Sequence, residues 1–198
     1  MHVKDPRVGP ESTVSAGLVV EVIGPAAAGK TTLVRALSSN DAGIRVGVDV
    51  GMLRYVVGFV RTIGSWMPRW VANHRRDRWF TWRETKSMVF LDAWYPALER
   101  QRGRSASVTV LDHGAFYRLA RLREFGPQIA HSEAFERWWK ASLDRWMKSI
   151  DVVVWLDGSD EVLLRRVEHR GHRKLASITS DEAKREFLAR YRRAFDGL

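Results

Sequence analysis

Short apolar runs alternate with segments of helical periodicity along this chain. Four runs rich in β-branched residues predict strands, at 18–23, 44–50, 107–111 and 152–156. The last run is almost entirely apolar, which is typical of a central parallel strand buried on both faces. Because strands and helical segments alternate, we predict an α/β fold with helices covering both faces of a parallel sheet.

The segments between and after these runs carry apolar side chains at helical spacing. The periodicity predicts helices at about 30–38, 77–101, 135–147, 159–169 and 180–195. In the third of these, an aromatic stripe predicts packing in the core rather than a cofactor site.

An apolar and aromatic segment with scattered arginines occupies 52–70. Gly58, Gly64 and Pro68 interrupt this segment, and residues of these types weaken or break helices. We therefore do not expect one continuous helix here.

Residues 1–17 contain two prolines and two glycines without periodicity, and they predict a flexible arm. The remaining stretch, 18–198, is long enough to bury a core and predicts a single domain. The arm lacks the apolar centre of a signal peptide, and no uncharged apolar run approaches the roughly 18 residues that a membrane span requires. A cytoplasmic protein without an integral membrane segment is expected.

The charge balance indicates an anionic ligand. The chain has 33 Lys and Arg residues and 23 Asp and Glu residues, which gives a formal net charge of +10. Such a charge attracts nucleotides, nucleic acid or an anionic membrane, so it does not select among them. The chain has no cysteine, which excludes disulfides, thiolate metal sites and cysteine nucleophiles.

The turn after the first predicted strand carries the pattern G-x-x-x-x-G-K-[ST]. Its glycines permit tight backbone turns, so that successive N–H groups and a helix N-terminus can surround a phosphate. Lys30 would reach the β- and γ-phosphates, and the Thr31 hydroxyl would bind Mg²⁺. The alternative is an ordinary glycine turn. The expected nucleotide contacts are Gly24, Ala27, Ala28, Gly29, Lys30, Thr31 and Thr32.

One acid lies at the end of the second predicted strand and another follows the third, at the sheet edge where ligands bind in such folds. Asp112 would hold Mg²⁺ or accept a proton from an attacking hydroxyl, or it would cap the turn that Gly114 allows. His113 is a candidate substrate contact, although isolated histidines are more often hydrogen-bonding surface or core residues. Asp49 is either an acceptor-binding group or base, or a cap of the next helix.

A basic run at 165–174 follows the last predicted strand. Phosphoryl transfer develops negative charge on the moving group, and arginines of a closing segment can stabilise that charge. Arg166 and Arg170 share a helix face at i, i+4, so we predict that they contact the phosphates, with a lid at about 169–179. The alternative is a solvated charged face.

Basic and aromatic residues are interleaved at 69–86. They could form an acceptor pocket that stacks a ring and clamps a phosphate. They could equally form a structural helix whose arginines extend over buried tryptophans, or a surface for nucleic acid or membrane. As substrate contacts in and before this region we select Arg54 and Arg83.

Together these motifs resemble the P-loop nucleoside and nucleotide kinases, most closely the thymidylate kinase-like group, over about 18–195. The segment 24–31 is similar to the family's phosphate loop, 110–114 to the motif after its third strand, and 154–170 to its fourth strand and arginine-bearing helix. His113 stands where the family has an arginine, and no final strand is evident. The resemblance implies a three-layer α/β/α fold with strands in the order 2-3-1-4 and a fifth strand missing.

The resemblance also implies an enzyme that uses ATP and Mg²⁺ to phosphorylate a small-molecule acceptor, foremost a nucleoside or nucleoside monophosphate. Lys30, Asp112, Arg166 and Arg170 would be catalytic, and Thr31 and Asp112 would hold the metal. Two alternatives stay open: a kinase of a sugar, lipid-linked or natural-product acceptor, and a P-loop ATPase stimulated by nucleic acid. Nucleic acid is not the expected partner, whereas peripheral membrane contact and a homodimer are left open.

Overall fold

The structure of the chain is a computed structural model, and it describes residues 17–73, 78–103, 107–169 and 180–198. Almost all of the predicted N-terminal arm and of the predicted lid, Arg170 included, lies outside the described residues.

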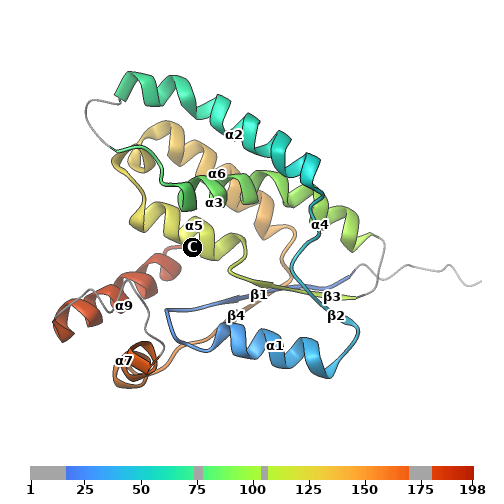
Figure 1. The fold of residues 1–198 in the computed structure, drawn as a ribbon, viewed down its shortest axis with the longest axis vertical. Helices are drawn as coiled ribbons and strands as arrows, with labels where there is room; N and C mark the ends of the chain where they lie inside the picture. Colours follow the sequence, from blue (N-terminus) through green and yellow to red (C-terminus); the bar gives the residue numbers. More distant parts are fainter. Residues whose placement is uncertain (1–16, 74–77, 104–106, 170–179) are drawn as a thin grey trace, which may run out of the picture.

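A four-stranded parallel sheet forms the centre of the described part (Figure 1). Its strands are β1 (Val19–Ile23), β2 (Ile44–Val46), β3 (Val108–Asp112) and β4 (Val152–Trp155). They lie in the predicted order, β2-β3-β1-β4. Since Val22 pairs with Asp112 and Ile23 with Trp155, the ends of β3 and β4 flank the loop that follows β1.

Helices cover both faces of the sheet, as predicted. Figure 1 shows α1 on one side and the group α3 to α6 on the other, with α2 outermost on that second side. The helices are α1 (Lys30–Asn40), α2 (Met52–Asn73), α3 (Trp82–Ala93), α4 (Tyr95–Arg102), α5 (Ala115–Phe125), α6 (Glu133–Met147), α7 (Asp160–His169) and α9 (Asp181–Asp196). A short 3₁₀ helix, Gln128–His131, precedes α6.

Side chains of β1 alternate between two cores, as the pleat of a strand requires. Val22 packs with Val34 of α1 on one face, and Val19 and Ile23 join the larger aromatic-rich cluster on the other. By the same alternation Glu21 faces the second, larger core, where α5 lies.

The aromatic stripe of α6 lies in that larger core, as predicted. Phe135, Trp139 and Trp146 are buried. The two indole N–H groups donate to the carbonyls of Leu119 and Leu91, each at 3.0 Å, so their polar atoms are satisfied inside the core.

Helix α2 is continuous from Met52 to Asn73, and our expectation of an interrupted segment is wrong. Gly58 sits against α3, where an added Cβ would lie 2.7 Å from the Ala93 Cβ. This glycine therefore permits close helix packing instead of ending the helix. Tertiary contacts outweigh the low helix propensity of the segment. They also outweigh the loss of one backbone hydrogen bond at Pro68, which has no N–H.

The helix predicted at 77–101 is divided into α3 and α4. Thr81 begins α3 with a capping box, accepting from the Glu84 N–H while the Glu84 carboxylate accepts from the Thr81 N–H. Pro96, in the first turn of α4, has no N–H to continue the ladder of α3. The chain therefore ends one helix at Ala93 and starts another at Tyr95.

Strand β4 is not buried on both faces, which corrects our prediction. Val152, Val153 and Trp155 are each at least 40% exposed. Within the described part of the chain β4 pairs with β1 alone, so it forms an edge of the sheet. An apolar run indicates that a strand can be buried. Whether the strand is buried depends on the elements that cover it.

Candidate phosphate and acceptor site

The loop between β1 and α1 adopts backbone conformations typical of phosphate-binding loops. Gly24 and Gly29 have φ values of 143° and 101°, and Ala27 has a φ of 64°. Turns that include such conformations can point successive backbone N–H groups into a concavity that binds anions. At Gly24 there is a second requirement, because an added Cβ would lie 2.0 Å from the carbonyl oxygen of Leu156.

We expect Gly24→Ala to lower the free energy of unfolding by about 2–4 kcal/mol, because it combines a positive φ with a clash against backbone. Gly29→Ala is the matched control, since its Cβ would meet nothing within 4 Å. It should cost only about 1–2 kcal/mol. Denaturant unfolding followed by circular dichroism measures both, and equal losses would show that the contact with Leu156 is unimportant.

Lys30 is buried inside this loop. Its Nζ donates to the carbonyls of Gly24, at 2.8 Å, and Pro25, at 2.7 Å. Burial lowers the pKa of Lys30 to about 8, against the opposing effect of the Asp112 charge. The Tyr117 ring also lies 5.8 Å from this Nζ. A buried cation held by carbonyl dipoles would gain strongly from an anionic ligand.

Asp112, at the end of β3, accepts a hydrogen bond from the Thr31 hydroxyl at 2.8 Å. His113 Nδ1 lies 3.0 Å from the other carboxylate oxygen, Oδ1, and this buried oxygen has no well-formed hydrogen bond with any described residue. Burial raises the pKa of Asp112, but His113, the Thr31 hydroxyl and the Lys30 charge outweigh burial and hold that pKa below its usual value. The carboxylate is therefore ionised beside the loop.

This pair of oxygen ligands fits Mg²⁺, which binds proteins through one or two side chains and takes its other ligands from water and phosphate. The observation that favours such an ion is the ionised Asp112 carboxylate held beside the Thr31 hydroxyl. A site built from three or more acids and histidines is not found among the described residues.

Glu21, on β1, fixes the backbone that follows Asp112. Its carboxylate is fully buried and accepts from the N–H groups of Phe116, at 3.0 Å, and Tyr117, at 2.9 Å. It thus caps the N-terminus of α5. Burial raises the pKa of Glu21 to about 7, although these hydrogen bonds and Arg118 act in the opposite direction.

Beside the loop lies a pocket of about 410 Å³, which we call the acceptor pocket. It reaches from Ala26 of the loop and His113 to α9, and every charged side chain in its lining is an arginine. Four aromatic side chains also line it. These arginines and aromatic residues are Arg83, Arg118, Arg121, Tyr117, Phe125, Phe187 and Tyr191.

Arg118 and Arg121 contact aromatic and hydroxyl groups, and within the described part of the chain neither forms an ion pair with a carboxylate, although the charges of Glu21 and Glu84 act on them. The Arg118 guanidinium lies 4.0 Å from the centre of the Phe90 ring and donates to Ser87 Oγ at 3.4 Å. Burial lowers the pKa of Arg118 to about 10, although Glu21 opposes this shift. Arg121 donates to the Tyr117 hydroxyl at 3.4 Å. Both cations are therefore available to an anionic ligand.

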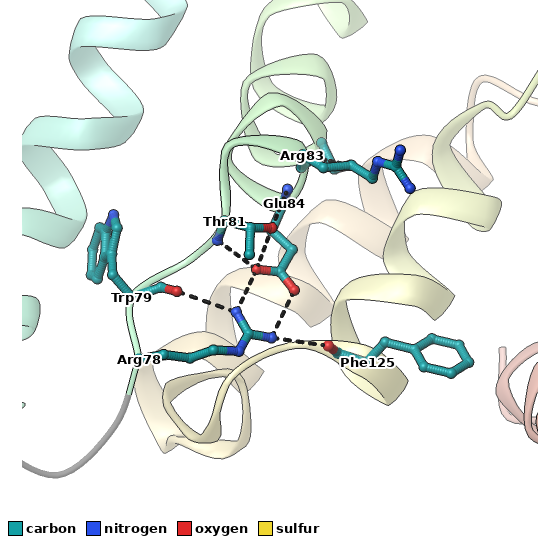
Figure 2. Close-up of polar contacts among 7 residues, drawn as sticks. Arg78, Trp79, Thr81, Arg83, Glu84 and Phe125 are labelled. Atoms are coloured by element: carbon teal, nitrogen blue, oxygen red, sulfur yellow. Dashed lines mark hydrogen bonds and ion pairs between the residues drawn. The ribbon is translucent and has the colours of Figure 1, made fainter. Parts of the chain in front are cut away.

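One wall of the acceptor pocket is anchored by an ion pair at the start of α3 (Figure 2). Arg78 binds both carboxylate oxygens of Glu84, at 2.8 and 3.0 Å, and donates to the carbonyl of Phe125 at 3.3 Å. Arg83 extends from the same helix away from this clamp (Figure 2). The clamp ties α3 to the end of α5, and both helices contribute arginines to the pocket.

A second pocket beside the loop contains one of the predicted phosphate contacts. Arg166 of α7 lines this pocket, of about 540 Å³, together with Ala27, Ala28, Gly29 and Thr32. The structure thus places this arginine beside the loop, and its contact with a phosphate stays a prediction, whereas Arg170 lies outside the described residues.

Two predicted substrate contacts lie elsewhere. Asp49 is exposed, three residues beyond the end of β2, and lines neither of the two pockets. Arg54 lines a separate groove beside α2. In the interleaved segment at 69–86, Phe80 is core and Arg78 is an ion-pair anchor. Among the described cations of this segment, Arg83 is the one that lines the acceptor pocket.

Sequence reasoning missed Glu21, Arg118 and Arg121. Glu21 had one signal, an acid within an otherwise apolar strand. The two arginines had a weaker signal, their i, i+3 spacing on the helix that follows Asp112. Neither signal shows which residues these side chains contact, because the contacting residues come from other parts of the chain.

Comparison with known proteins adds a family match. A family model described as an AAA domain matches residues 19–198. Among solved structures, one similar to this chain is deoxyadenosine kinase from M. mycoides with bound dATP, at 13% identity and a TM-score of 0.45, covering 90% of this chain and 84% of that one. A likeness this distant says nothing about the substrate of this chain. No curated protein matches the sequence.

Proposed function

This chain belongs to the AAA domain family of P-loop proteins, and from that premise we propose that it transfers the γ-phosphoryl group of ATP to an anionic small molecule. The resemblance to P-loop nucleoside and nucleotide kinases is confirmed at the level of the superfamily. The thymidylate kinase-like assignment stays a prediction.

One observation carries the proposal: the acceptor pocket adjoins the phosphate loop, and its described lining contains three arginines and no acid. Charge-assisted hydrogen bonds from arginine favour carboxylate or phosphate groups on the acceptor. The surrounding aromatic side chains favour a ring. A nucleoside monophosphate combines both features and is the acceptor that we propose first.

The proposed roles follow from position. Lys30 and the loop would hold the β- and γ-phosphates, and Arg166 would stabilise the charge that develops during transfer. Thr31 and Asp112 would hold Mg²⁺, which neutralises charge on phosphate oxygens when it is bound. Arg118 and Arg121 would fix the anionic group of the acceptor so that its attacking oxygen faces the γ-phosphate.

Incubation with ATP, Mg²⁺ and a panel of nucleosides, nucleoside monophosphates, sugars and sugar phosphates tests this function. We expect phosphorylation of a nucleoside monophosphate, detected by mass spectrometry of the product. Arg121→Gln should raise the KM for the acceptor by about tenfold or more, because it removes one charge-assisted hydrogen bond to the acceptor. The KM for ATP should change little.

The matched control is Arg137→Gln, an exposed arginine of α6, which should change neither constant. Transfer to an uncharged sugar would contradict the proposed acceptor class. ATP hydrolysis that requires DNA or RNA would contradict phosphoryl transfer to a small molecule altogether.

A further inference from the structure

Helix α2 exposes an apolar stripe along its length. Leu53, Val57, Val60, Met67 and Val71, which we call the α2 stripe, follow one another at helical spacing and are between 42% and 76% exposed. Apolar residues at such spacing lie on one side of a helix. Because a stripe of this kind normally faces a core, its exposure requires an explanation.

The opposite side of α2 already supplies the contacts that hold the helix in place. Thr62 and Trp66 are buried, and the Trp66 ring packs against Phe80, Phe135 and Trp138. Figure 1 shows α2 as the outermost helix on its side of the sheet. The contacts that hold α2 on the described part of the chain are therefore made by the side opposite the α2 stripe.

The surroundings of the α2 stripe are strongly basic. Helix α2 contains three arginines and no acid. Beside it runs a groove of about 680 Å³, lined by Arg54, Arg61, Arg100 and Arg145, with Asp92 as its one acidic lining residue. Asp92 is bound to Arg145 at 3.1 Å, so the groove keeps a net positive charge.

We propose that the α2 stripe and the adjacent arginines bind the surface of an anionic lipid bilayer. The apolar side chains would enter the boundary between headgroups and acyl chains, and Arg54 and Arg61 would contact lipid phosphates. Contact is peripheral, because no helix in the described ranges is both long and apolar enough to cross a bilayer.

Charge decides between a bilayer and a second copy of the chain. Two α2 helices packed against each other would bring arginines together with no acid on either helix to pair with them, which is unfavourable. An anionic lipid surface supplies the complementary charge along the whole stripe. It also suits the net charge of +10.

Sedimentation of the full chain with vesicles tests the proposal and requires no catalytic activity. We expect binding to vesicles of phosphatidylglycerol mixed with phosphatidylcholine, weakened by salt, and little binding to phosphatidylcholine alone. Arg54→Gln and Arg61→Gln should each reduce the partition coefficient by about fivefold. The double variant Leu53→Asp, Val60→Asp should reduce binding to the level of neutral vesicles.

Two matched controls lie on α6, Arg137→Gln and Met147→Asp, which change an exposed cation and an exposed apolar residue. Both should bind like the original protein, and circular dichroism checks that every variant is folded. Equal binding to charged and neutral vesicles would overturn the proposal. It would also be overturned if light scattering showed a dimer that Leu53→Asp, Val60→Asp dissociates, because a second copy would then cover the stripe.

Discussion

Replacing Lys30 by methionine is expected to lower the turnover number for phosphoryl transfer by roughly 10²–10³-fold. Its ammonium group is buried in the phosphate loop, where it donates to the carbonyls of Gly24 and Pro25. Methionine keeps a long side chain but removes the charge that would stabilise the transferring phosphate. Single-turnover measurements at saturating ATP and acceptor report this loss directly.

Two controls separate the loss of this charge from a loss of folding. Circular dichroism should show that the Lys30→Met protein is folded, since the substitution removes a buried charge and its desolvation cost. Lys140→Met, at an exposed position of α6, should leave the turnover number unchanged. Full activity of the Lys30→Met protein would contradict the proposed role of the loop.

Glu21→Ala is expected to lower the free energy of unfolding by roughly 2–4 kcal/mol. The substitution leaves the N–H groups of Phe116 and Tyr117 without their acceptor inside the core. Chemical unfolding measures the loss. Glu133→Ala, which removes an exposed carboxylate from α6, is the matched control and should change stability by no more than about 0.5 kcal/mol.

The same residue predicts how stability depends on pH. Because burial raises the pKa of Glu21 from 4.5 to about 7 in the folded protein, the folded state retains a proton that the unfolded state loses. Its contribution to stability is fully present below pH 4.5 and is lost as the pH rises through about 7. The total loss is about 3 kcal/mol, and Glu21→Gln, which stays neutral, should not show it.

The pKa of Glu21 is a balance between burial and interactions that favour the ionised carboxylate. Arg118 and the N–H groups at the start of α5 both favour the ionised carboxylate, and burial outweighs them. If the original protein and Glu21→Gln show parallel stability curves between pH 4.5 and 7, the raised pKa of Glu21 is wrong.

The strands themselves and the phosphate loop could be predicted because their signals are local, whereas the strand order followed from the family resemblance. Period-two and continuous apolar runs mark strands wherever they pack, and the spacing from Gly24 to Thr31 encodes a turn that few other residues can form. The position of Asp112 followed from the same logic, since the carboxyl ends of parallel strands meet at one edge of the sheet. The structure places this carboxylate 2.8 Å from the Thr31 hydroxyl.

Burial and helix continuity were harder to predict, because they depend on neighbours that are distant in sequence. Gly58 permits a close approach of α2 to Ala93 instead of ending a helix, and the apolar β4 lies at an edge of the described sheet. The acceptor pocket is the clearest case. Its arginines come from α3 and α5 and its aromatic walls from α5 and α9, so no single stretch of sequence contains it.

By itself, then, the sequence determined the alternating strands and helices of an α/β scaffold and the phosphate-loop motif from Gly24 to Thr31, since these depend on short-range patterns. Only the tertiary structure decided what surrounds that site. Folding brings Arg83, Arg118 and Arg121 into one pocket, buries Glu21 beneath the start of α5 and leaves the α2 stripe exposed. The physical reason is that burial and charge environment are properties of contacts between elements, which local residue patterns do not encode.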